Sequence, residues 1–187
     1  MVNVSINNVV YNIPQSWADV NINQWRSLRH IQTYLKENMT EDEQLNIELE
    51  IISIFTDIPF DILLNLPGEY YKLIINNLTF YKNSKMSDEI KASIDVDGVE
   101  YKLIDLTKLT LGDRANIDII RDNGNIEDRI GRVMSILYRK EDEGDLTMDE
   151  RDDKEDLFNE NVSIDDVYST LLFFLIMIES YKKSLIY

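Results

Sequence analysis

The stretch Ile6-Asn7-Asn8-Val9-Val10-Tyr11-Asn12-Ile13 is followed, about ninety residues later, by a similar one, Val96-Asp97-Gly98-Val99-Glu100-Tyr101-Lys102-Leu103. Apolar and polar residues alternate from Val2 to Ile13 around the pair Asn7-Asn8, and from Ile94 to Leu103 around the pair Asp97-Gly98. Both pairs suit the positive φ angles of a tight turn. Each stretch therefore predicts a β-hairpin. The distance between the two stretches exceeds the period of a solenoid repeat, so the similarity indicates a duplicated unit.

Helix-capping residues follow both predicted hairpins. Asn21 can cap a helix that begins at the next residue, and Thr110 occupies the corresponding place in the second copy. Two further helix starts have the capping-box pattern of a threonine and a glutamate three residues later, from Thr40 to Glu43 and from Thr147 to Glu150. We therefore expect several helices after each hairpin.

Two of the expected helices have distinctive apolar patterns. The helix after Thr40 has an apolar stripe that consists of Ile47, Ile51, Ile54 and Phe55. The final helix, from Ile164 to about Tyr181, is apolar nearly all round between Leu171 and Ile178. Because a helix without a polar face is usually enclosed by other elements, we expect this one to be central in the core.

These patterns predict an α+β fold that is mainly helical, with two β-hairpins each followed by helices in a pseudo-duplicated arrangement. Residues 1–82 are expected to form the first hairpin-plus-helices half, and residues 83–91 the link. Residues 92–187 are expected to form the second half, which carries an acidic insert at residues 141–160. A chain of 187 residues can fold as two small lobes or pack as one domain, and the sequence leaves both open.

Negative charge is concentrated in the acidic insert. The chain has a net charge of −16, and the segment from Glu141 to Glu160 holds eleven acidic residues against Arg151 and Lys154. Such a chain gains little from contacts with phosphate groups, so direct nucleic-acid binding is not expected. The insert is interpreted either as a solvated loop and helix face or as a docking surface for a basic partner.

The sequence offers no constellation of catalytic residues. It has no cysteine, which excludes disulfides and thiol catalysis, and its only histidine is His30. The adjacent carboxylates Asp152-Asp153 and Asp165-Asp166 diverge by about 100° on a helix and therefore do not converge on a substrate. We therefore expect no enzymatic activity. A small enzyme or a metal sensor is a third possible class of function. Metal analysis of the purified protein and replacement of His30 by alanine would test it.

Metal and cofactor sites are not expected either. If Gly144 were the glycine of an EF-hand loop, the first coordinating position would be Arg139, a cation in the place of an aspartate. The sequence also lacks a phosphate-binding or dinucleotide-binding glycine loop. The prediction is therefore a protein without a cofactor, whose function depends on contacts with other proteins.

The sequence shows no targeting or membrane-spanning segment. The start Met1-Val2-Asn3-Val4-Ser5 lacks the basic and apolar regions of a signal peptide, and the longest apolar run has eight residues, from Leu171 to Ile178. A membrane-spanning helix needs about 20 apolar residues. We expect a protein that is made in the cytoplasm and does not contact a membrane.

Five aromatic or apolar residues are candidates for partner binding. Trp17 and Trp25 can anchor an interface, because tryptophan is enriched at binding hot spots, although packing between the hairpin and the first helix is the alternative. At the other end of the chain, Tyr181, Leu185 and Tyr187 are expected either to fold back on the core or to dock on a neighbour.

The segment from Ile13 to Trp25, Ile-Pro-Gln-Ser-Trp-Ala-Asp-Val-Asn-Ile-Asn-Gln-Trp, resembles a pattern in small structural and assembly proteins of tailed bacteriophages. In those proteins a hairpin with a Gly-x-x-Tyr motif leads into Pro-x-x-Trp and then into a threonine-capped helix. The present chain has Asn8 in place of the glycine and Asn21 in place of the threonine. Ile136-Leu137-Tyr138-Arg139, the acidic insert and the segment from Val162 to Phe174 are similar to the rest of the pattern.

Amino-acid usage adds to this resemblance. The chain has 25 isoleucines and 17 asparagines but only three alanines, a usage typical of an AT-rich genome and similar to that of crAss-like phages of gut bacteria. The resemblance implies a non-enzymatic structural or accessory component of the virion, made in the host cytoplasm and acting as a protein–protein adaptor near the portal or tail. The alternative that it implies is a tail-assembly chaperone absent from the mature particle.

The implied partners are other phage structural proteins, from the portal, the tail or the capsid, and multiple copies of this chain are expected in the assembly. The resemblance implies no catalytic residues.

Overall fold

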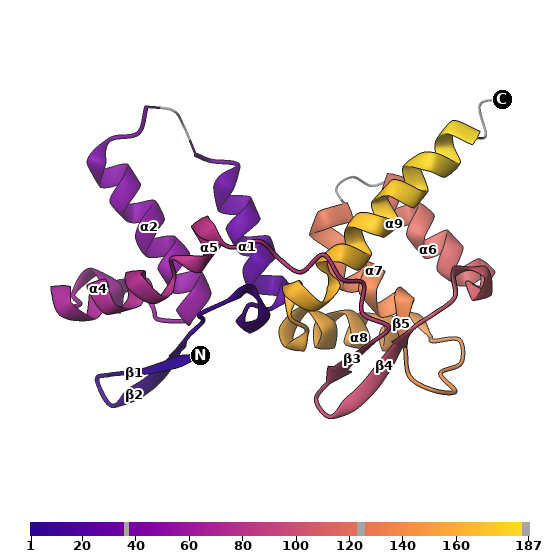
Figure 1. Ribbon diagram of the computed structural model, residues 1–187, viewed down its shortest axis with the longest axis horizontal. Coiled ribbons are helices and arrows are strands. Elements are labelled where there is room, and N and C mark those ends of the chain that lie inside the picture. Colours follow the sequence, from indigo (N-terminus) through magenta and orange to yellow (C-terminus); the bar gives the residue numbers. More distant parts are fainter. Residues whose placement is uncertain (36–37, 123–125, 185–187) are drawn as a thin grey trace. The chain divides into compact units, whose positions relative to one another are not determined.

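The computed structural model describes residues 1–35, 38–122 and 126–184, with side chains up to residue 177. It divides into two compact units, Met1–Lys85 (unit 1) and Met86–Tyr187 (unit 2). Each unit contains a small antiparallel sheet and several helices, so the predicted α+β, mainly helical fold is confirmed (Figure 1). The division between Lys85 and Met86 falls within the segment 83–91 that the sequence indicates as a link.

Unit 1 begins with the first hairpin. Strand β1 (Val2–Ile6) pairs antiparallel with β2 (Val9–Ile13), and the turn residues Asn7 and Asn8 have φ angles of 52° and 65°. Asparagine tolerates this left-handed conformation better than most residues, which explains why it can stand where glycine is commoner. The turn closes the hairpin in the register that places Val4 and Ile6 in the core.

Helices make up the rest of unit 1. As predicted, Asn21 caps the first of them: its side chain accepts a hydrogen bond from the backbone N–H of Gln24 at 2.8 Å, and the Gln24 side chain accepts from the Asn21 N–H at 3.1 Å. Thr40 and Glu43 form the predicted capping box. The elements are η1 (Trp17–Asp19), α1 (Ile22–Gln32), α2 (Glu41–Thr56), α3 (Phe60–Leu64), α4 (Gly68–Asn77) and α5 (Phe80–Asn83).

The core of unit 1 lies where α1, α2 and the hairpin meet, and α2 contributes one of two apolar faces to it. The fully buried apolar residues of α2 are Leu49, Ile52 and Phe55, whereas Ile47, Ile51 and Ile54 are only partly buried. Of the apolar stripe noted in the sequence, Phe55 is therefore buried and the other three residues are half-buried. With apolar residues on so many positions, α2 has two apolar faces, and the pattern alone did not show which one is enclosed.

Unit 2 begins with the second hairpin and adds a third strand. β3 (Ser93–Val96) pairs with β4 (Val99–Leu103) around the turn residues Asp97 and Gly98, which have φ angles of 52° and 77°. The short strand β5 (Tyr138–Arg139) pairs with the other edge of β4, giving the order β3-β4-β5. The chain leaves the preceding helix at Leu137 to join the sheet.

The helices of unit 2 follow the second hairpin. α7 packs against both α8 and α9, and it is buried along its whole length. Thr147 and Glu150 form the predicted capping box at the start of α8. The elements are η2 (Leu106–Lys108), α6 (Leu111–Asp122), η3 (Ile126–Arg129), α7 (Ile130–Leu137), α8 (Met148–Asn161) and α9 (Ile164–Ser184).

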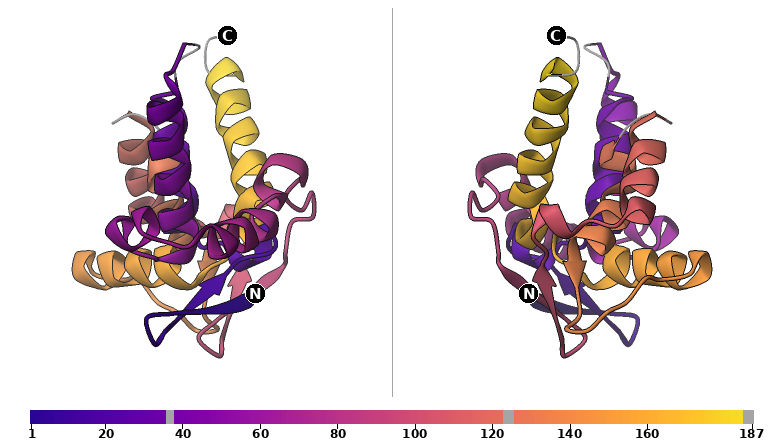
Figure 2. Two further views of the ribbon diagram at one scale, coloured as in Figure 1. Left: turned by 90° about the vertical axis from the view of Figure 1, so that its left-hand side faces the viewer. Right: turned by 90° about the vertical axis from the view of Figure 1, so that its right-hand side faces the viewer.

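Helix α9 is buried on one face of the part whose side chains the structure describes, residues 164–177. Val167, Leu171 and Phe174 are buried, but Leu172 and Phe173 are 40% and 49% exposed. The expectation of a fully enclosed helix was therefore wrong for the other face. The views of Figures 1 and 2 agree that the C-terminal turns of α9 extend past the other helices of unit 2. Of the helices that the structure describes, none has an apolar stretch long enough for a membrane span.

Candidate functional site

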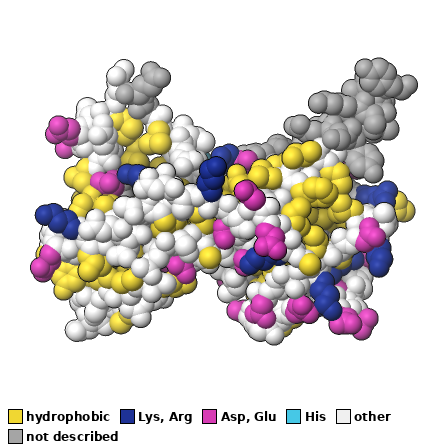
Figure 3. Space-filling view, in the orientation of Figure 1, with side chains coloured by type: hydrophobic (Ala, Val, Ile, Leu, Met, Phe, Trp, Pro, Cys, Tyr) yellow, Lys and Arg dark blue, Asp and Glu magenta, His cyan; other side chains and the backbone are white. Residues whose placement is uncertain are grey.

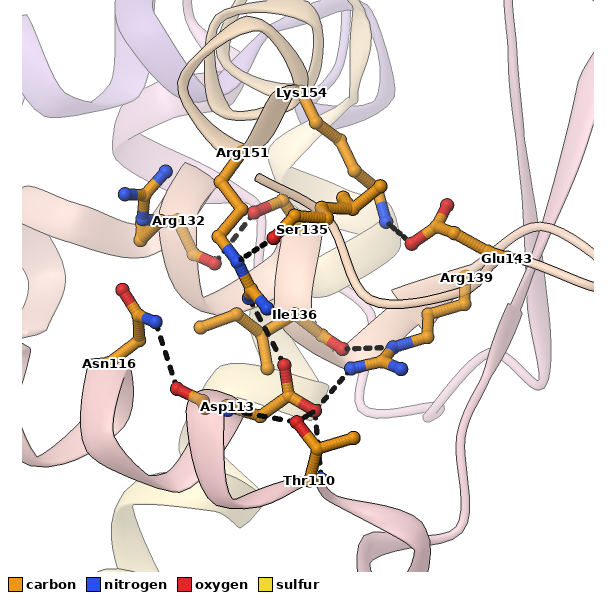
Figure 4. Close-up of polar contacts among 12 residues, drawn as sticks. Thr110, Asp113, Asn116, Arg132, Ser135, Ile136, Arg139, Glu143, Arg151 and Lys154 are labelled. Carbon is orange, nitrogen blue, oxygen red and sulfur yellow. Dashed lines mark hydrogen bonds and ion pairs between the residues drawn. The ribbon is translucent and has the colours of Figure 1, made fainter. Parts of the chain in front are cut away.

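A buried cluster of charged residues joins α6, α8 and strand β5 in unit 2 (Figure 4). At its centre, Asp113 has no solvent-exposed surface and receives hydrogen bonds from the backbone N–H and the hydroxyl of Thr110, at 2.9 and 2.8 Å. Arg151 of α8 contacts its other oxygen at 3.1 Å, and Arg139 of β5 forms a second ion pair. Asp113 therefore caps α6 and binds two other elements to it.

The surroundings of Asp113 favour its ionised form. Burial raises the pKa of its carboxyl, but the two hydrogen bonds from Thr110 and the ion pairs with Arg151 and Arg139 outweigh this effect. The net result is a pKa below the ordinary value of 3.8. A carboxylate that is held ionised in this way is a poor general base, because its lone pairs are occupied and its proton affinity is low.

A second buried ion pair lies beside the first. The ammonium of Lys154, 7% exposed, contacts Glu143 at 2.6 Å and donates to the backbone carbonyl of Tyr138 at 2.9 Å. It also lies 5.3 Å from the ring centre of Tyr101 and 5.6 Å from that of Phe158. Burial lowers the pKa of Lys154 despite the opposing effect of Glu143. The acidic insert is thus part of the core of unit 2 as well as its surface.

The charged cluster has no room for a substrate. The cavity lined by Ser135, Arg139 and Arg151 has a volume of about 10 Å³, enough for about one water molecule. Within the described ranges, no group of three or more histidine, aspartate or glutamate residues is arranged to hold a metal ion. The geometry of the cluster is that of a structural clamp between α6, β5 and α8.

A larger depression lies on unit 1 between α1 and α2, with one end at α5. We call it the α1–α2 groove. Its volume is about 520 Å³, it is open to solvent, and Figure 3 shows hydrophobic side chains in the hollow between the two helices. The lining residues are Leu28, Gln32, Leu35, Met39, Glu41, Gln44, Leu45, Ile47, Glu48, Ile51, Tyr81 and Lys82.

The α1–α2 groove has an apolar floor and a mainly acidic rim. Leu28 forms a buried part of the floor, while Leu45 is 48% exposed on its wall. Glu41 and Glu48 contribute negative charge. Glu48 also accepts a short hydrogen bond from Tyr71, and burial together with this contact raises the pKa of Tyr71 to about 12. Such a lining suits an apolar helix or side chain, with charges at the margin to orient it.

The second exposed apolar surface is on α9 of unit 2. Leu172, Phe173 and Ile176 are 40%, 49% and 65% exposed. At 3.6 residues per turn, these three positions fall within about 100° of the helix circumference, so they lie on one side of α9. Figure 3 shows hydrophobic side chains gathered on the part of unit 2 where α9 lies. We call this surface the α9 face.

The structure places the predicted partner-binding residues in two different settings. Trp17 and Trp25 are 8% and 5% exposed in the core of unit 1, which favours the packing alternative over an interface. The Trp17 indole donates to the carbonyl of Ser84 at 3.2 Å and packs edge-on against Phe80. The side chain of Tyr181, and all of Leu185 and Tyr187, lie outside the described residues.

Sequence reasoning missed both the α1–α2 groove and the buried clamp. The sequence does contain an indication of the groove, because α2 has more apolar residues than a single buried face needs. The clamp had a partial signal, since Thr110-x-x-Asp113 is a capping pattern with aspartate in place of glutamate. Its arginines are 26 and 38 residues from Asp113, and no local pattern predicts such pairs.

Comparison of the chain with models of protein families, with curated proteins and with solved structures finds no match. Functional inference therefore rests on the geometry of the two units and on the sequence pattern described above.

Proposed function

We propose that this chain is a non-enzymatic structural or accessory component of a tailed-bacteriophage virion, in which it acts as a protein–protein adaptor near the portal or tail. The observation that carries the adaptor role is the presence of two unlike apolar surfaces on separate units. The α1–α2 groove is concave and lies on unit 1, whereas the α9 face is convex and lies on unit 2.

Both surfaces have the chemistry of protein docking. Each combines several exposed aliphatic or aromatic side chains with little charge at its centre, as the cores of protein interfaces do. Single exposed apolar residues are ordinary on any protein surface, but contiguous ones beside a groove indicate a binding region. The phage context is supported by the resemblance of the segment from Ile13 to Trp25 to the tailed-phage pattern.

Quantitative mass spectrometry of purified particles tests the virion assignment. In a tailed phage that encodes this chain, we expect it in the mature particle at a fixed ratio to the portal or tail proteins. A phage carrying the Leu45→Glu substitution in the α1–α2 groove should incorporate less of the chain, because a charge then occupies the apolar wall. Leu111→Glu, at a residue that is 86% exposed and outside both surfaces, is the matched control.

Two outcomes contradict the proposal in different ways. If the chain is present in infected cells and bound to tail proteins but absent from purified particles, it is a tail-assembly chaperone. If it is found with neither tail nor portal proteins at any stage of infection, both the virion and the chaperone assignments are wrong.

A further inference from the structure

We propose that the α1–α2 groove binds the α9 face of a second copy of this chain, so that copies associate head to tail. This inference deepens the proposed adaptor function, since it names one partner of the groove. The contact joins unit 1 of one copy to unit 2 of the next, and it uses surfaces that are exposed in the single chain.

The shapes of the two surfaces are complementary. The α1–α2 groove is a trough of about 520 Å³ between two helices, which is the form that accepts an amphipathic helix in helix-in-groove recognition. The α9 face presents Leu172, Phe173 and Ile176 along one side of a helix, the spacing that such grooves bind. With 21 residues, α9 is about 30 Å long, and its last turns extend past its own unit (Figure 2).

The charges also favour this pairing. The rim of the α1–α2 groove includes Glu41, Glu48 and Lys82 and is net negative, and a chain with a net charge of −16 repels other copies over most of its surface. The segment from Val167 to Ile178 contains no charged residue, so α9 can approach an acidic rim without this penalty. Beyond Ile178 the sequence has Glu179, Lys182 and Lys183, a net positive charge that is opposite in sign to that of the rim.

The contact is heterologous, because a groove on one copy meets a helix on another. A heterologous contact leaves a free groove and a free helix at the ends of every pair, so it repeats into a ring or an open row rather than stopping at a dimer. A single helix in a groove buries less than the area of a standard protein interface, so we expect weak association, with a dissociation constant in the range of about 1–100 µM.

Sedimentation velocity and light scattering of the purified full-length chain test the proposal. Over about 1–200 µM, a range set by the expected affinity, the average mass should rise steadily with concentration. Leu45→Glu in the groove and Phe173→Glu on α9 should each weaken the association at least tenfold. Leu111→Glu adds the same charge to a residue outside both surfaces and should leave it unchanged. Circular dichroism of each variant checks that it is folded.

Mixing the two weakened variants is the decisive experiment. The Leu45→Glu copy retains an intact α9, and the Phe173→Glu copy retains an intact groove, so one productive contact remains between them. We expect an equimolar mixture to form a one-to-one pair that does not grow further, at concentrations at which each variant alone is monomeric.

Three results overturn the inference. The first is a wild-type chain that stays monomeric across the whole range, including the case in which α9 occupies the groove of its own chain. The second is association that survives both substitutions. The third is an associating wild type whose two weakened variants fail to pair when mixed. None of these results bears on the presence of the chain in phage particles, so the failure of this inference is distinguishable from failure of the proposed function.

Discussion

Gly131 of α7 and Asn159 of α8 lie so close together that no larger residue fits at position 131. A Cβ atom at Gly131 would lie 2.1 Å from Oδ1 of Asn159 and 2.6 Å from its Cγ. Asn159 is 5% exposed and therefore has little space to move away. The approach of α7 to α8 thus depends on the absence of a side chain at a single position.

Gly131→Ala is expected to lower the free energy of unfolding by about 1–3 kcal/mol, the usual cost of forcing an extra carbon into a packed interior. The control is Gly112→Ala in α6, where a Cβ meets its nearest atoms at 3.6 and 3.8 Å, which is ordinary contact. That control should be neutral or stabilising by up to about 1 kcal/mol, because alanine favours a helix. Chemical denaturation measures both, and equal effects would contradict the packing argument.

Asp113 is the second residue on which unit 2 depends. Asp113→Asn removes the charge that pairs Arg139 and Arg151 while keeping the shape of the side chain. Because one partner of a buried ion pair is lost, we expect destabilisation of about 3 kcal/mol. Asp118→Asn, which breaks an exposed pair with Arg121, is the matched control and should cost less than about 1 kcal/mol. A similar loss in both variants would show that burial of the pair is unimportant.

The same residue predicts a dependence of stability on pH. The pKa of Asp113 is lowered in the folded chain, so the unfolded chain takes up a proton first as the pH falls. The stability that Asp113 contributes is therefore present above its unfolded pKa, near 3.8, and is lost as the pH falls through the lower folded value. We expect the difference in stability between the wild type and Asp113→Asn to be constant above about pH 5 and to shrink below pH 4. Urea denaturation at a series of pH values measures it, and a difference unchanged at low pH would contradict the assignment.

Among the secondary-structure elements, those with local determinants are the ones that sequence predicts well. The hairpin turns at Asn7-Asn8 and Asp97-Gly98 and the caps at Asn21, Thr40 and Thr147 depend on residues no more than three positions apart, and the structure has all of them. These features are local because a turn or a cap satisfies its hydrogen bonds within its own segment.

Elements whose placement depends on distant partners were predicted less well. Tyr138-Arg139 leaves α7 because β4 offers an unpaired edge, and the signal for this lies some forty residues earlier in the chain. The α9 face is exposed and the second apolar face of α2 is only partly buried, because each helix has more apolar positions than its own unit encloses. Periodicity identifies apolar faces, but the number of faces that other elements cover is decided by the tertiary fold.

The end of α2 offers a test at this scale. Its C-cap residue, Asp57, has a φ angle of 56°, a left-handed conformation that costs a residue with a side chain more than it costs glycine. Asp57→Gly should therefore raise the free energy of unfolding by about 0.5–1 kcal/mol.

Asn46→Gly in the interior of the same helix is the control with the opposite sign. It should lower stability by up to about 1 kcal/mol, because glycine is a poor helix former. Thermal denaturation followed by circular dichroism compares the two variants. A loss of stability in Asp57→Gly would show that the aspartate side chain has a role that outweighs its backbone conformation.

The whole molecule consists of two units that share a hairpin-and-helix beginning and then diverge. The similar beginnings were predicted from the sequence, because the two hairpin stretches share a turn pair, a valine and a tyrosine at corresponding places. The divergence was less evident, since unit 2 gains a third strand, a buried ionic clamp and a long final helix, all held together by contacts between distant residues.

If each unit has its own core, damage to one should not spread to the other. Phe55→Ala removes a buried ring from unit 1 and Ile130→Ala a buried side chain from unit 2, at a cost of roughly 2–5 kcal/mol each. Hydrogen exchange measured by mass spectrometry should accelerate in residues 1–85 for the first variant and in residues 86–184 for the second. Acceleration across both units in either variant would show that they unfold as one.

Because the α1–α2 groove and the α9 face are on different units, a row of copies joined through them has a direction. One end of such a row always presents an empty groove, and the other end always presents a bare helix. Growth, arrest and attachment can therefore be controlled separately at each end. A neighbouring protein that supplies only a groove, or only a helix, stops the row at one end and leaves the other able to extend.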